Sequence, residues 1–383
     1  MRWQEPKDET LSILLESVRR FGKEEIEPAY GKYEEQGFFP AELVKKMGAM
    51  GLFGLMIPEE YGGSGMGTVA ASFVARELAY RWPALHLIWT ANSSLAAFPI
   101  AYAGTKEQKA RILPQLASGE ILGCYALTEP NSGSDAGSMT MKAEWRPDSL
   151  TWSLNGSKIF ITNAFHASVA VVFARTSKKS ISAFLVESSE PGLRHPGVTV
   201  RYIPKRVQKS SDFCEIHCND VFLPVSALLG KEGKGFAIAM QTLDGGRINI
   251  AAQAIGMAMR VFDDAYAYVH VRKQFGRLVW ENQKVQFDFA EAYARLIAAW
   301  ALVIEASERR DAGENITRIA SSAKLVATET AWKVASDLET YFGGMAFTQE
   351  SAWLPRLLDI APTRVYEGAN NIQHMVIAKH LDD

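Results

Sequence analysis

The tract from Glu129 to Asp135 has residue types that let a ligand approach the backbone closely. A strand-like run, Tyr125–Thr128, stops there and gives way to a proline, several hydroxyl side chains and a glycine. Gly133 and the small side chain of Ser134 would leave backbone N–H groups accessible. On its own such a tract is typical of a polar loop, so its interpretation depends on other polar segments of the chain.

Three later segments carry groups that could bind or react with a ligand: Leu154–Asn163, Arg272–Gly276 and Tyr366–Gly368. An arginine such as Arg272 can bind phosphate oxygens, although an arginine in a loop is usually solvated. Glu367 would become a competent base in a dry pocket, because burial raises the pKa of a carboxyl group toward neutrality. At the start of a helix the same carboxylate is more often only a favourable partner of the helix dipole.

Common nucleotide-binding motifs are absent from the sequence. No G-x-G-x-x-G pattern follows an expected strand, and there is no P-loop. The glycines of Gly230–Gly235 lie between an expected sheet and an expected helix, so we interpret them as a turn. A nucleotide cofactor would have to be held by hydroxyl and backbone N–H groups along a sheet edge, with cations for its phosphates.

Two other kinds of site are not supported. Phe213–Cys218 alternates like a strand, which places His217 on the opposite face from Cys214 and Cys218 and argues against a metal site. The serines at 93–94 and in the 129–135 tract lack a recognisable His–Asp arrangement, so nucleophilic hydrolysis is not expected.

The composition is that of an ordinary globular protein. Of 383 residues, 48% are hydrophobic and 22% are charged, which is enough for a large core. A formal net charge of −2 offers no basic field for nucleic acid or anionic lipid. Three cysteines fit a reducing compartment, and the N-terminus resembles neither a signal peptide nor a transit peptide. No apolar stretch is long enough for a membrane span, so we expect a cytoplasmic protein that binds neither nucleic acid nor membrane.

Periodicity predicts three successive regions and an α+β fold. Residues 1–120 are expected to be helical, with long helices over 68–80 and 84–103. Residues 121–230 carry short β-branched and aromatic runs, which predict an antiparallel sheet or small barrel with a hairpin turn at Asn155-Gly156. Residues 231–383 return to helical spacing, in a register suited to a bundle of long helices. The expected strands cover residues 151–154, 158–162, 169–174, 181–186, 198–203 and 213–222.

In this order and at these separations, the four polar segments resemble those of the acyl-CoA dehydrogenase family of flavoenzymes. The resemblance runs from about residue 10 to the C-terminus. It implies the family's fold: an N-terminal helical domain, a central β domain and a C-terminal domain like a four-helix bundle. It also implies FAD as cofactor, an acyl-CoA thioester as substrate, an electron-transfer flavoprotein as electron acceptor, and a homotetramer formed by the C-terminal helices.

By this resemblance, residues of the central region would surround the flavin. Gly133 and Ser134 would contact its ribityl-pyrophosphate and the pantetheine arm of the substrate. The Thr162 hydroxyl would lie near N5, where it can stabilise the reduced ring. Phe160 stands where relatives often carry tryptophan. The residues that would lie along the two sides of the ring are Tyr125, Leu127, Thr128, Phe160, Ile161 and Thr162.

A second group would hold the pyrophosphate and adenosine of FAD across a subunit boundary. Its members are Arg272, Gln274, Phe275, Gln283, Gly343, Gly344, Ala369 and Asn371. The chain departs from the family here: Thr340 stands where glutamine is frequent, and Ala369 and Asn371 replace a threonine and a glutamine or glutamate. These changes remove hydrogen-bonding groups and predict a weaker hold on the adenosine.

The catalytic base implied by the resemblance is Glu367 of the Tyr366-Glu367-Gly368 motif. It would remove the α-proton of the thioester while a hydride leaves the β-carbon. Some members of the family place the base directly before the arginine that corresponds to Arg247, where this chain has Gly246. The backbone N–H of Glu367 and a ribityl hydroxyl would hold the thioester oxygen.

The resemblance leaves the acyl group open. Local sequence is closest to the glutaryl-CoA branch, but His86 and Ala79 replace the arginine and the pocket glutamate of that branch. These two replacements argue against a glutaryl substrate, and short linear, branched and cyclic acyl groups remain open. The residues expected to contact the substrate are Ser134, Asp244, Arg247, Trp89, Ala91, Tyr366 and Gly368.

Two alternatives to the leading interpretation were weighed. A protein of the same fold could act on an acyl-carrier-protein thioester, or pass its electrons to dioxygen as an oxidase. A protein of another class would bind flavin without turnover. The intact Glu367 and the absence of a basic patch argue against that last alternative.

Overall fold

The computed structural model describes residues 3–382, which divide into two compact units. One, here called the helical unit, comprises residues up to 29, 68–86 and those from 247 onward. The other, the sheet unit, comprises residues 30–67 and 87–246. The expected order of helices, then strands, then helices is confirmed. The predicted domain boundaries at 120/121 and 230/231 do not coincide with this division and stay a prediction.

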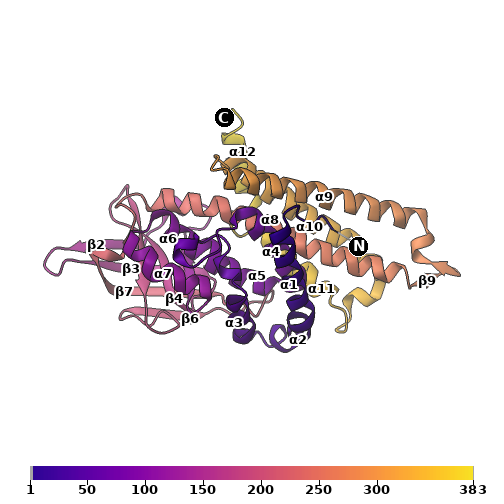
Figure 1. Cartoon of the computed structure of the whole chain (residues 1–383), viewed down its shortest axis with the longest axis horizontal. Helices are drawn as coiled ribbons and strands as arrows, with labels where there is room; N and C mark the ends of the chain where they lie inside the picture. Colours follow the sequence, from indigo (N-terminus) through magenta and orange to yellow (C-terminus); the bar gives the residue numbers. More distant parts are fainter. Residues whose placement is uncertain (1–2, 383) are drawn as a thin grey trace. The chain divides into compact units, whose positions relative to one another are not determined.

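Within residues 283–339, two long helices of the helical unit each bury one face. On α9 (Gln283–Asp311) the buried residues include Phe289, Leu296 and Trp300, whose spacing matches the helical repeat. Figure 1 shows α9 lying beside α10, another long helix of this unit. The remaining helices of the unit are α1 (Glu9–Phe21), α4 (Gly67–Arg81), the part of α8 (Gly235–Val269) from residue 247, α10 (Thr317–Glu339), α11 (Trp353–Ile360) and α12 (Asn370–Lys379).

Small residues allow close packing in the helical unit. Buried alanines such as Ala323 and Ala327 recur every three or four residues along α10. On α8, a Cβ atom at Gly256 would lie 2.2 Å from the carbonyl oxygen of Arg76 on α4. The two helices therefore approach each other at a point where only glycine fits.

The sheet unit contains an eight-stranded sheet in the order β6-β7-β3-β2-β4-β5-β8, with β1 paired to β4. Most neighbours are antiparallel, which confirms the predicted sheet, but β1 runs parallel to β4. The helices of the unit are α3 (Ala41–Ala49), α6 (Phe98–Ala103) and α7 (Lys106–Ser118), while α2 (Glu27–Glu34) and α5 (Pro83–Thr90) extend across the division. The strands are β1 (Leu122–Ala126), β2 (Lys142–Arg146), β3 (Thr151–Ile161), β4 (Ala167–Arg175), β5 (Ile181–Glu187), β6 (Val198–Tyr202), β7 (Cys214–Pro224) and β8 (Leu228–Leu229).

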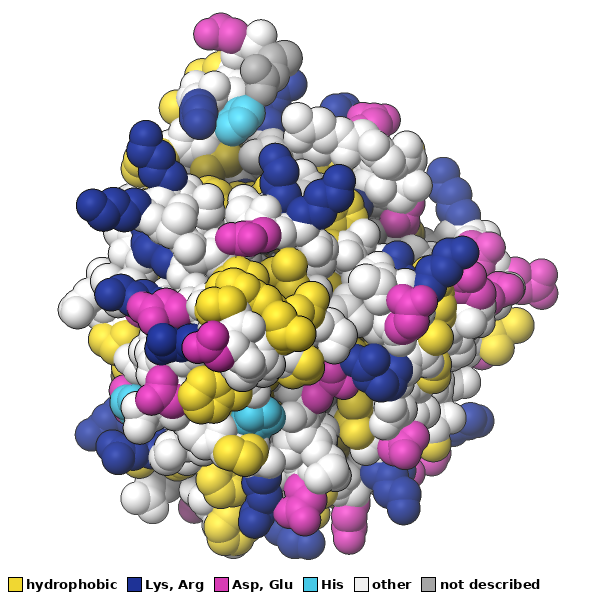
Figure 2. All heavy atoms as spheres, turned by 90° about the vertical axis from the view of Figure 1, so that its left-hand side faces the viewer, with side chains coloured by type: hydrophobic (Ala, Val, Ile, Leu, Met, Phe, Trp, Pro, Cys, Tyr) yellow, Lys and Arg dark blue, Asp and Glu magenta, His cyan; other side chains and the backbone are white. Residues whose placement is uncertain are grey.

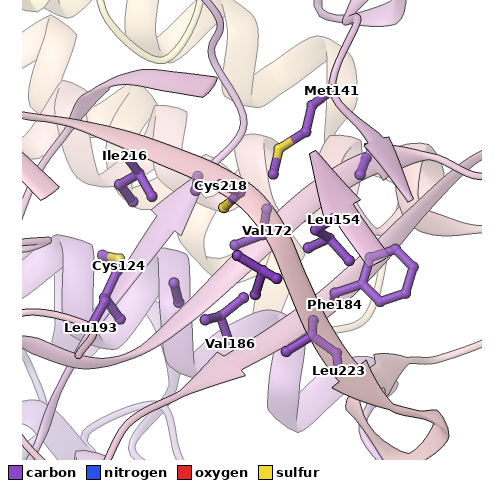
Figure 3. Close-up of a cluster of buried hydrophobic side chains, with 14 of the residues drawn as sticks. Cys124, Met141, Leu154, Val172, Phe184, Val186, Leu193, Ile216, Cys218 and Leu223 are labelled. Carbon is purple, nitrogen blue, oxygen red and sulfur yellow. The ribbon is translucent and has the colours of Figure 1, made fainter. Parts of the chain in front are cut away.

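Side chains from most of these strands gather in one hydrophobic cluster, drawn in Figure 3. Cys124 and Cys218 lie in this cluster and act as small apolar side chains. Along β7, Cys214 and Cys218 are buried while His217 is partly exposed, so the predicted placement of the histidine on the opposite face is confirmed. Among residues 3–382, no three side chains of the metal-binding types come together.

The predicted hairpin at Asn155-Gly156 is wrong. Both residues lie inside β3, whose pairing with β7 shifts register between Leu154 and Gly156. The Asn155 side chain accepts from the Asp220 N–H (2.8 Å) and donates to Asp220 Oδ1 (3.0 Å). It therefore stabilises a β-bulge and not a turn. The hairpin is formed by β2 and β3, which are consecutive and antiparallel. β2 was not among the predicted strands.

The helix predicted over 84–103 is present in three successive pieces. Between α5 and α6 the stretch Ala91–Ala97 is a π-helix. Pro99 follows at the start of α6 and has no N–H to donate, so the wider turn before it accommodates the missing hydrogen bond. Asn92 of this stretch accepts from the Gly123 N–H (2.8 Å) and donates to the Leu116 carbonyl (3.1 Å), which fixes the start of β1.

Figure 2 shows one face of the molecule, on which basic and acidic side chains are interspersed around apolar ones. Neither sign of charge dominates this face. No helix in the described part of the chain is long and apolar enough to cross a membrane.

Candidate active site

The end of β1 and the last residues of β3 lie side by side in the sheet unit. The Ile159 N–H donates to the Thr128 carbonyl (2.9 Å), and the Lys158 ammonium donates to the Leu127 carbonyl (2.9 Å). The structure thus brings together the two segments that were predicted to lie along a flavin ring. Leu127 is buried and Thr128 half-buried, while Tyr125 packs inside the hydrophobic core of the unit.

A buried ion pair, which was not predicted, fixes this junction. Lys158 is fully buried and donates to Glu129 Oε1 (2.9 Å). Glu129 also accepts from the backbone N–H groups of Thr140 and Met141 (2.5 and 2.9 Å). Burial raises the pKa of Glu129, but the ammonium and these N–H donors outweigh it and hold the pKa below its usual value. The sequence signal was a lysine directly before the apolar run Ile159–Ile161.

The loop that follows β1 presents small groups to solvent. The Ser132 hydroxyl donates to the Asp135 carbonyl (2.6 Å), and the backbones of Glu129 and Ser132 bond to each other. Gly133 and Ser134 are exposed, and a Cβ atom built on Gly133 would meet no atom within 4 Å. Hydrogen bonds inside the loop therefore fix its shape, while the space next to Gly133 stays open, as a ligand-binding loop requires.

Phe160 and Asn163 adopt left-handed backbone conformations, with φ of 65° and 68°. The Phe160 ring is 53% exposed and stacks on Phe213, with ring centroids 4.9 Å apart. Asn163 is buried and donates to the Ile88 and Gly123 carbonyls (2.9 and 3.4 Å). Between them, Ile161 is buried and Thr162 is half-buried. Residues held in this strained region are common at functional sites.

Three residues predicted to contact substrate are buried in the sheet unit. Trp89 is fully buried, and its indole N–H donates to the Leu52 carbonyl (2.7 Å). Ala91 begins the π-helical stretch, and Asp244 lies on the first part of α8. Their contact with substrate stays a prediction.

Glu367 lies in the helical unit, in the turn before α12. Its φ of 54° is left-handed, and its Oε2 atom is buried with no hydrogen-bond partner among residues 3–382. Burial raises the pKa of Glu367 to about 7, against the opposing effect of the nearby Arg247 and Lys324 cations. A carboxylate with that pKa is half ionised near neutrality and has a free oxygen, so it can act as a general base.

Several side chains fix the turn that carries this carboxylate. The Tyr366 hydroxyl donates to Gln253 Oε1 on α8 (2.8 Å). Gln373 Nε2 donates to the carbonyls of Glu367 (3.1 Å) and Gly368 (2.7 Å). Gly368 has a φ of 88°, and a Cβ atom there would lie 2.7 Å from the Gln373 amide. A side chain at Gly368 would therefore disturb the turn.

Two buried cations from neighbouring helices approach the Glu367 carboxylate. Arg247 on α8, which was predicted, is buried, and its Nη1 donates to the Ser321 hydroxyl (3.3 Å). Lys324 on α10 was not predicted. It is fully buried and donates to the Gly368 carbonyl (2.9 Å) and to Asn370 Oδ1 (2.8 Å).

Most of the second predicted group lies in a different part of the helical unit from Glu367. Arg272, Gln274 and Phe275 are exposed on a small hairpin of β9 (Lys273–Gln274) and β10 (Arg277–Leu278). Tyr268, just before them, stacks on Phe342 with centroids 4.7 Å apart, which brings the exposed Gly343 and Gly344 into the same neighbourhood. Gln283, also exposed, starts α9, whereas Ala369 and Asn371 flank the start of α12 near Glu367.

Three family models match the chain and together cover most of it. They describe the N-terminal, middle and C-terminal domains of acyl-CoA dehydrogenases, and they match residues 8–120, 124–221 and 233–381 respectively.

Curated and solved relatives agree with these matches. The mitochondrial short-chain specific acyl-CoA dehydrogenase of Homo sapiens is 38% identical over 377 residues, covering 97% of this chain and 90% of its own length. The butyryl-CoA dehydrogenase structure from Megasphaera elsdenii has a TM-score of 0.94 at 34% identity and covers 100% of both chains. A glutaryl-CoA dehydrogenase from Mycobacterium smegmatis, solved in complex with FADH2, has a TM-score of 0.91 at 29% identity and covers 98% of this chain and 95% of its own. The chain therefore belongs to the acyl-CoA dehydrogenase family of flavin-dependent oxidoreductases.

Proposed function

We propose that this protein removes two hydrogens from the α and β carbons of a short-chain, branched or cyclic acyl-CoA thioester. The observation that carries the proposal is the Glu367 carboxyl: its Oε2 is buried without a partner in residues 3–382, and its pKa is raised to about 7. Glu367 would accept the α-proton at this oxygen. Family membership supports the thioester as substrate.

The residues present fit FAD as the cofactor. The β1 loop offers exposed backbone N–H and hydroxyl groups at Gly133 and Ser134, and Thr162 offers a half-buried hydroxyl at the end of β3. When bound, FAD supplies the two-electron acceptor for the hydride that leaves the β-carbon. The chain's own residues bind the thioester, keep the carboxyl group desolvated and take the proton.

A homotetramer is proposed because two members of the second cofactor group, Gly343 and Gly344, lie far along α10 from the base, whereas Ala369 and Asn371 lie beside it. Lys324 adjoins the Glu367 turn, and Gly343 follows the end of the same helix at Glu339. Fifteen helical residues span about 22 Å, so one chain would present these groups to two different FAD molecules. Chain assembly is tested by light scattering, and the cytoplasmic location by cell fractionation.

The acyl group is proposed to be short. The similar proteins named above act, by their names, on short-chain, butyryl and glutaryl thioesters. His86 at the position of the glutaryl branch's arginine is buried, and burial lowers its pKa to about 3, so it carries no charge for a second carboxylate. A neutral short acyl group fits better than a glutaryl group.

Anaerobic addition of acyl-CoA thioesters to the FAD-loaded protein tests the proposal. Butyryl-CoA or another short thioester should bleach the flavin absorbance, and Glu367→Gln should keep FAD but abolish bleaching. Bleaching only by acyl-carrier-protein thioesters would reassign the carrier. An electron-transfer flavoprotein should then reoxidise the enzyme; equally fast reoxidation by dioxygen would identify an oxidase. Absence of bleaching by every thioester would favour a flavin-binding protein without turnover.

A further inference from the structure

We propose that Lys324 is a positioning residue of the reaction, which fixes the backbone beside the Glu367 carboxylate and favours its ionised form. This inference rests on the proposed function of Glu367. It concerns a residue of α10 that lies 43 positions before the base in sequence and donates directly to the turn that carries it.

The geometry gives Lys324 a structural hold on the turn. A fully buried ammonium needs partners, and Lys324 has two that flank the base: the Gly368 carbonyl (2.9 Å) and Asn370 Oδ1 (2.8 Å). Asn370 in turn donates to the Thr328 hydroxyl (3.0 Å), one turn further along α10. The residue after Glu367 is thus anchored to α10 through a charged donor, whose hydrogen bonds are stronger than neutral ones.

This anchoring opposes backbone strain. A non-glycine residue at φ of 54° is strained, and it persists only where the surroundings determine the conformation. The Gly368 carbonyl accepts from both Lys324 and Gln373, and the Glu367 carbonyl accepts from Gln373. Three hydrogen bonds therefore hold the two peptide groups that define the orientation of the base.

The charge of Lys324 acts on the same group. The charged side chains that influence Glu367 are Arg247 on α8 and Lys324 on α10, and both lower its pKa against the effect of burial. Lys324 itself is desolvated, which lowers its pKa to about 7; Glu367 and Glu329 raise it, while Arg247 and Arg364 lower it further. Each member of the Lys324–Glu367 pair thus favours the charged form of the other, and the two titrate as one unit.

The consequence for catalysis follows from the balance of charges. When a cation lowers the pKa of Glu367, a larger fraction of the molecules carries the ionised base at neutral pH. Burial alone would leave the carboxyl group protonated. Lys324 offsets part of the cost of burial, so that the carboxyl group is both dry and available to take a proton.

An infrared titration of the FAD-loaded protein without substrate tests this role. The Glu367 carboxyl band is identified by its loss in Glu367→Gln. In Lys324→Met its midpoint should rise by about one unit or more, because a neighbouring opposite charge has been removed. Lys324→Gln, which keeps an N–H donor but not the charge, should show the same rise. Lys333→Met, on an exposed part of α10, should leave the midpoint unchanged.

Flavin reduction by a thioester provides the second measurement. A midpoint raised from about 7 to about 8 lowers the ionised fraction, and hence the reduction rate at pH 7, about fivefold, with recovery near pH 9. Because Lys324 also fixes the turn, Lys324→Met should stay slower than Lys324→Gln at pH 9, and equal rates there would reject this part of the proposal. An unchanged midpoint in folded Lys324→Met and Lys324→Gln would overturn the proposal. The titration needs no turnover, so it can show the raised midpoint even if no thioester reduces the flavin. A failure of every thioester to reduce the flavin would reject the proposed function and leave the role of Lys324 standing.

Discussion

Glu367→Gln should stabilise the protein at neutral and alkaline pH while it abolishes activity. Burial raises the folded-state pKa of this carboxyl group from 4.5 to about 7, so the folded protein holds the proton more tightly than the unfolded chain does. The stability that this proton contributes is fully present below pH 4.5 and is lost as the pH rises through about 7. Glutamine resembles the protonated carboxyl and cannot ionise, so the variant avoids this loss.

The expected magnitude follows from the shift. About 2.5 units at about 1.4 kcal/mol per unit give an upper limit of about 3.5 kcal/mol above pH 7, and the partial exposure of Glu367 reduces it. At pH 5 wild-type Glu367 is largely protonated, so the two proteins should differ by less than about 1 kcal/mol. Glu367 raises the pKa of Lys324, so the variant also loses this attraction, which reduces the expected gain in stability at pH 8.

Thermal unfolding of the FAD-loaded proteins at pH 5 and pH 8, at equal protein concentration, provides the assay. Glu367→Gln should melt a few degrees higher at pH 8 and about equally at pH 5. Glu329→Gln is the matched control: Arg364 helps to hold the pKa of Glu329 below its usual value, so this variant should lose stability at pH 8. Two results would refute the assignment of a desolvated base. In the first, Glu367→Gln is no more stable than wild type at pH 8. In the second, the difference in melting temperature between the two proteins is the same at pH 5 and pH 8.

Two further predictions concern the framework around the site. Lys158→Met leaves the Glu129 carboxylate buried without its cation and should destabilise the protein by about 3–5 kcal/mol in denaturant unfolding; a loss below 1 kcal/mol would show that the pair does not fix the β1–β3 junction. Gly256→Ala places a Cβ atom 2.2 Å from the Arg76 carbonyl oxygen and should lower the melting temperature, whereas Gly31→Ala, with open space around it on α2, should raise stability by about 1 kcal/mol. Equal effects of the two glycine substitutions would contradict the close approach of α8 and α4.

The sequence predicted the order of elements because that order depends on local periodicity. Runs of β-branched and aromatic residues such as 169–174 and 181–186 became β4 and β5, and the helical spacing of the C-terminal region became helices such as α9, on which Phe289, Leu296 and Trp300 are buried. The hairpin at Asn155-Gly156 was wrong because a two-residue turn and a bulge draw on the same residue types. Pairing with the distant Asp220 decided between them, and no local pattern contains that contact.

The polar framework of the site was missed for the same reason. Glu129 and Lys158 are 29 residues apart, and Lys324 and the Gly368 carbonyl are 44 residues apart. A lone lysine in an apolar strand or helix signals only that some partner must exist, because a buried charge without one is too costly. The fold is needed to say which acceptor meets it. The site segments themselves were recognised from their residue types and order, and not from any contact.

Several residues of those segments adopt a strained backbone conformation that local propensity does not predict. Of the eight non-glycine residues with positive φ in the described chain, four lie in the three segments singled out from the sequence: Phe160, Asn163, Phe275 and Glu367. Each such conformation costs about 1–3 kcal/mol, so a sequence chosen for local preference alone would place glycine there. The side chains are retained because Asn163 bonds two carbonyls of the sheet unit and Glu367 presents an unpartnered carboxyl oxygen, roles that glycine cannot fill. Half of the residues with this strained conformation therefore lie in the site segments, and the surrounding hydrogen bonds show what holds Asn163 and Glu367 in place.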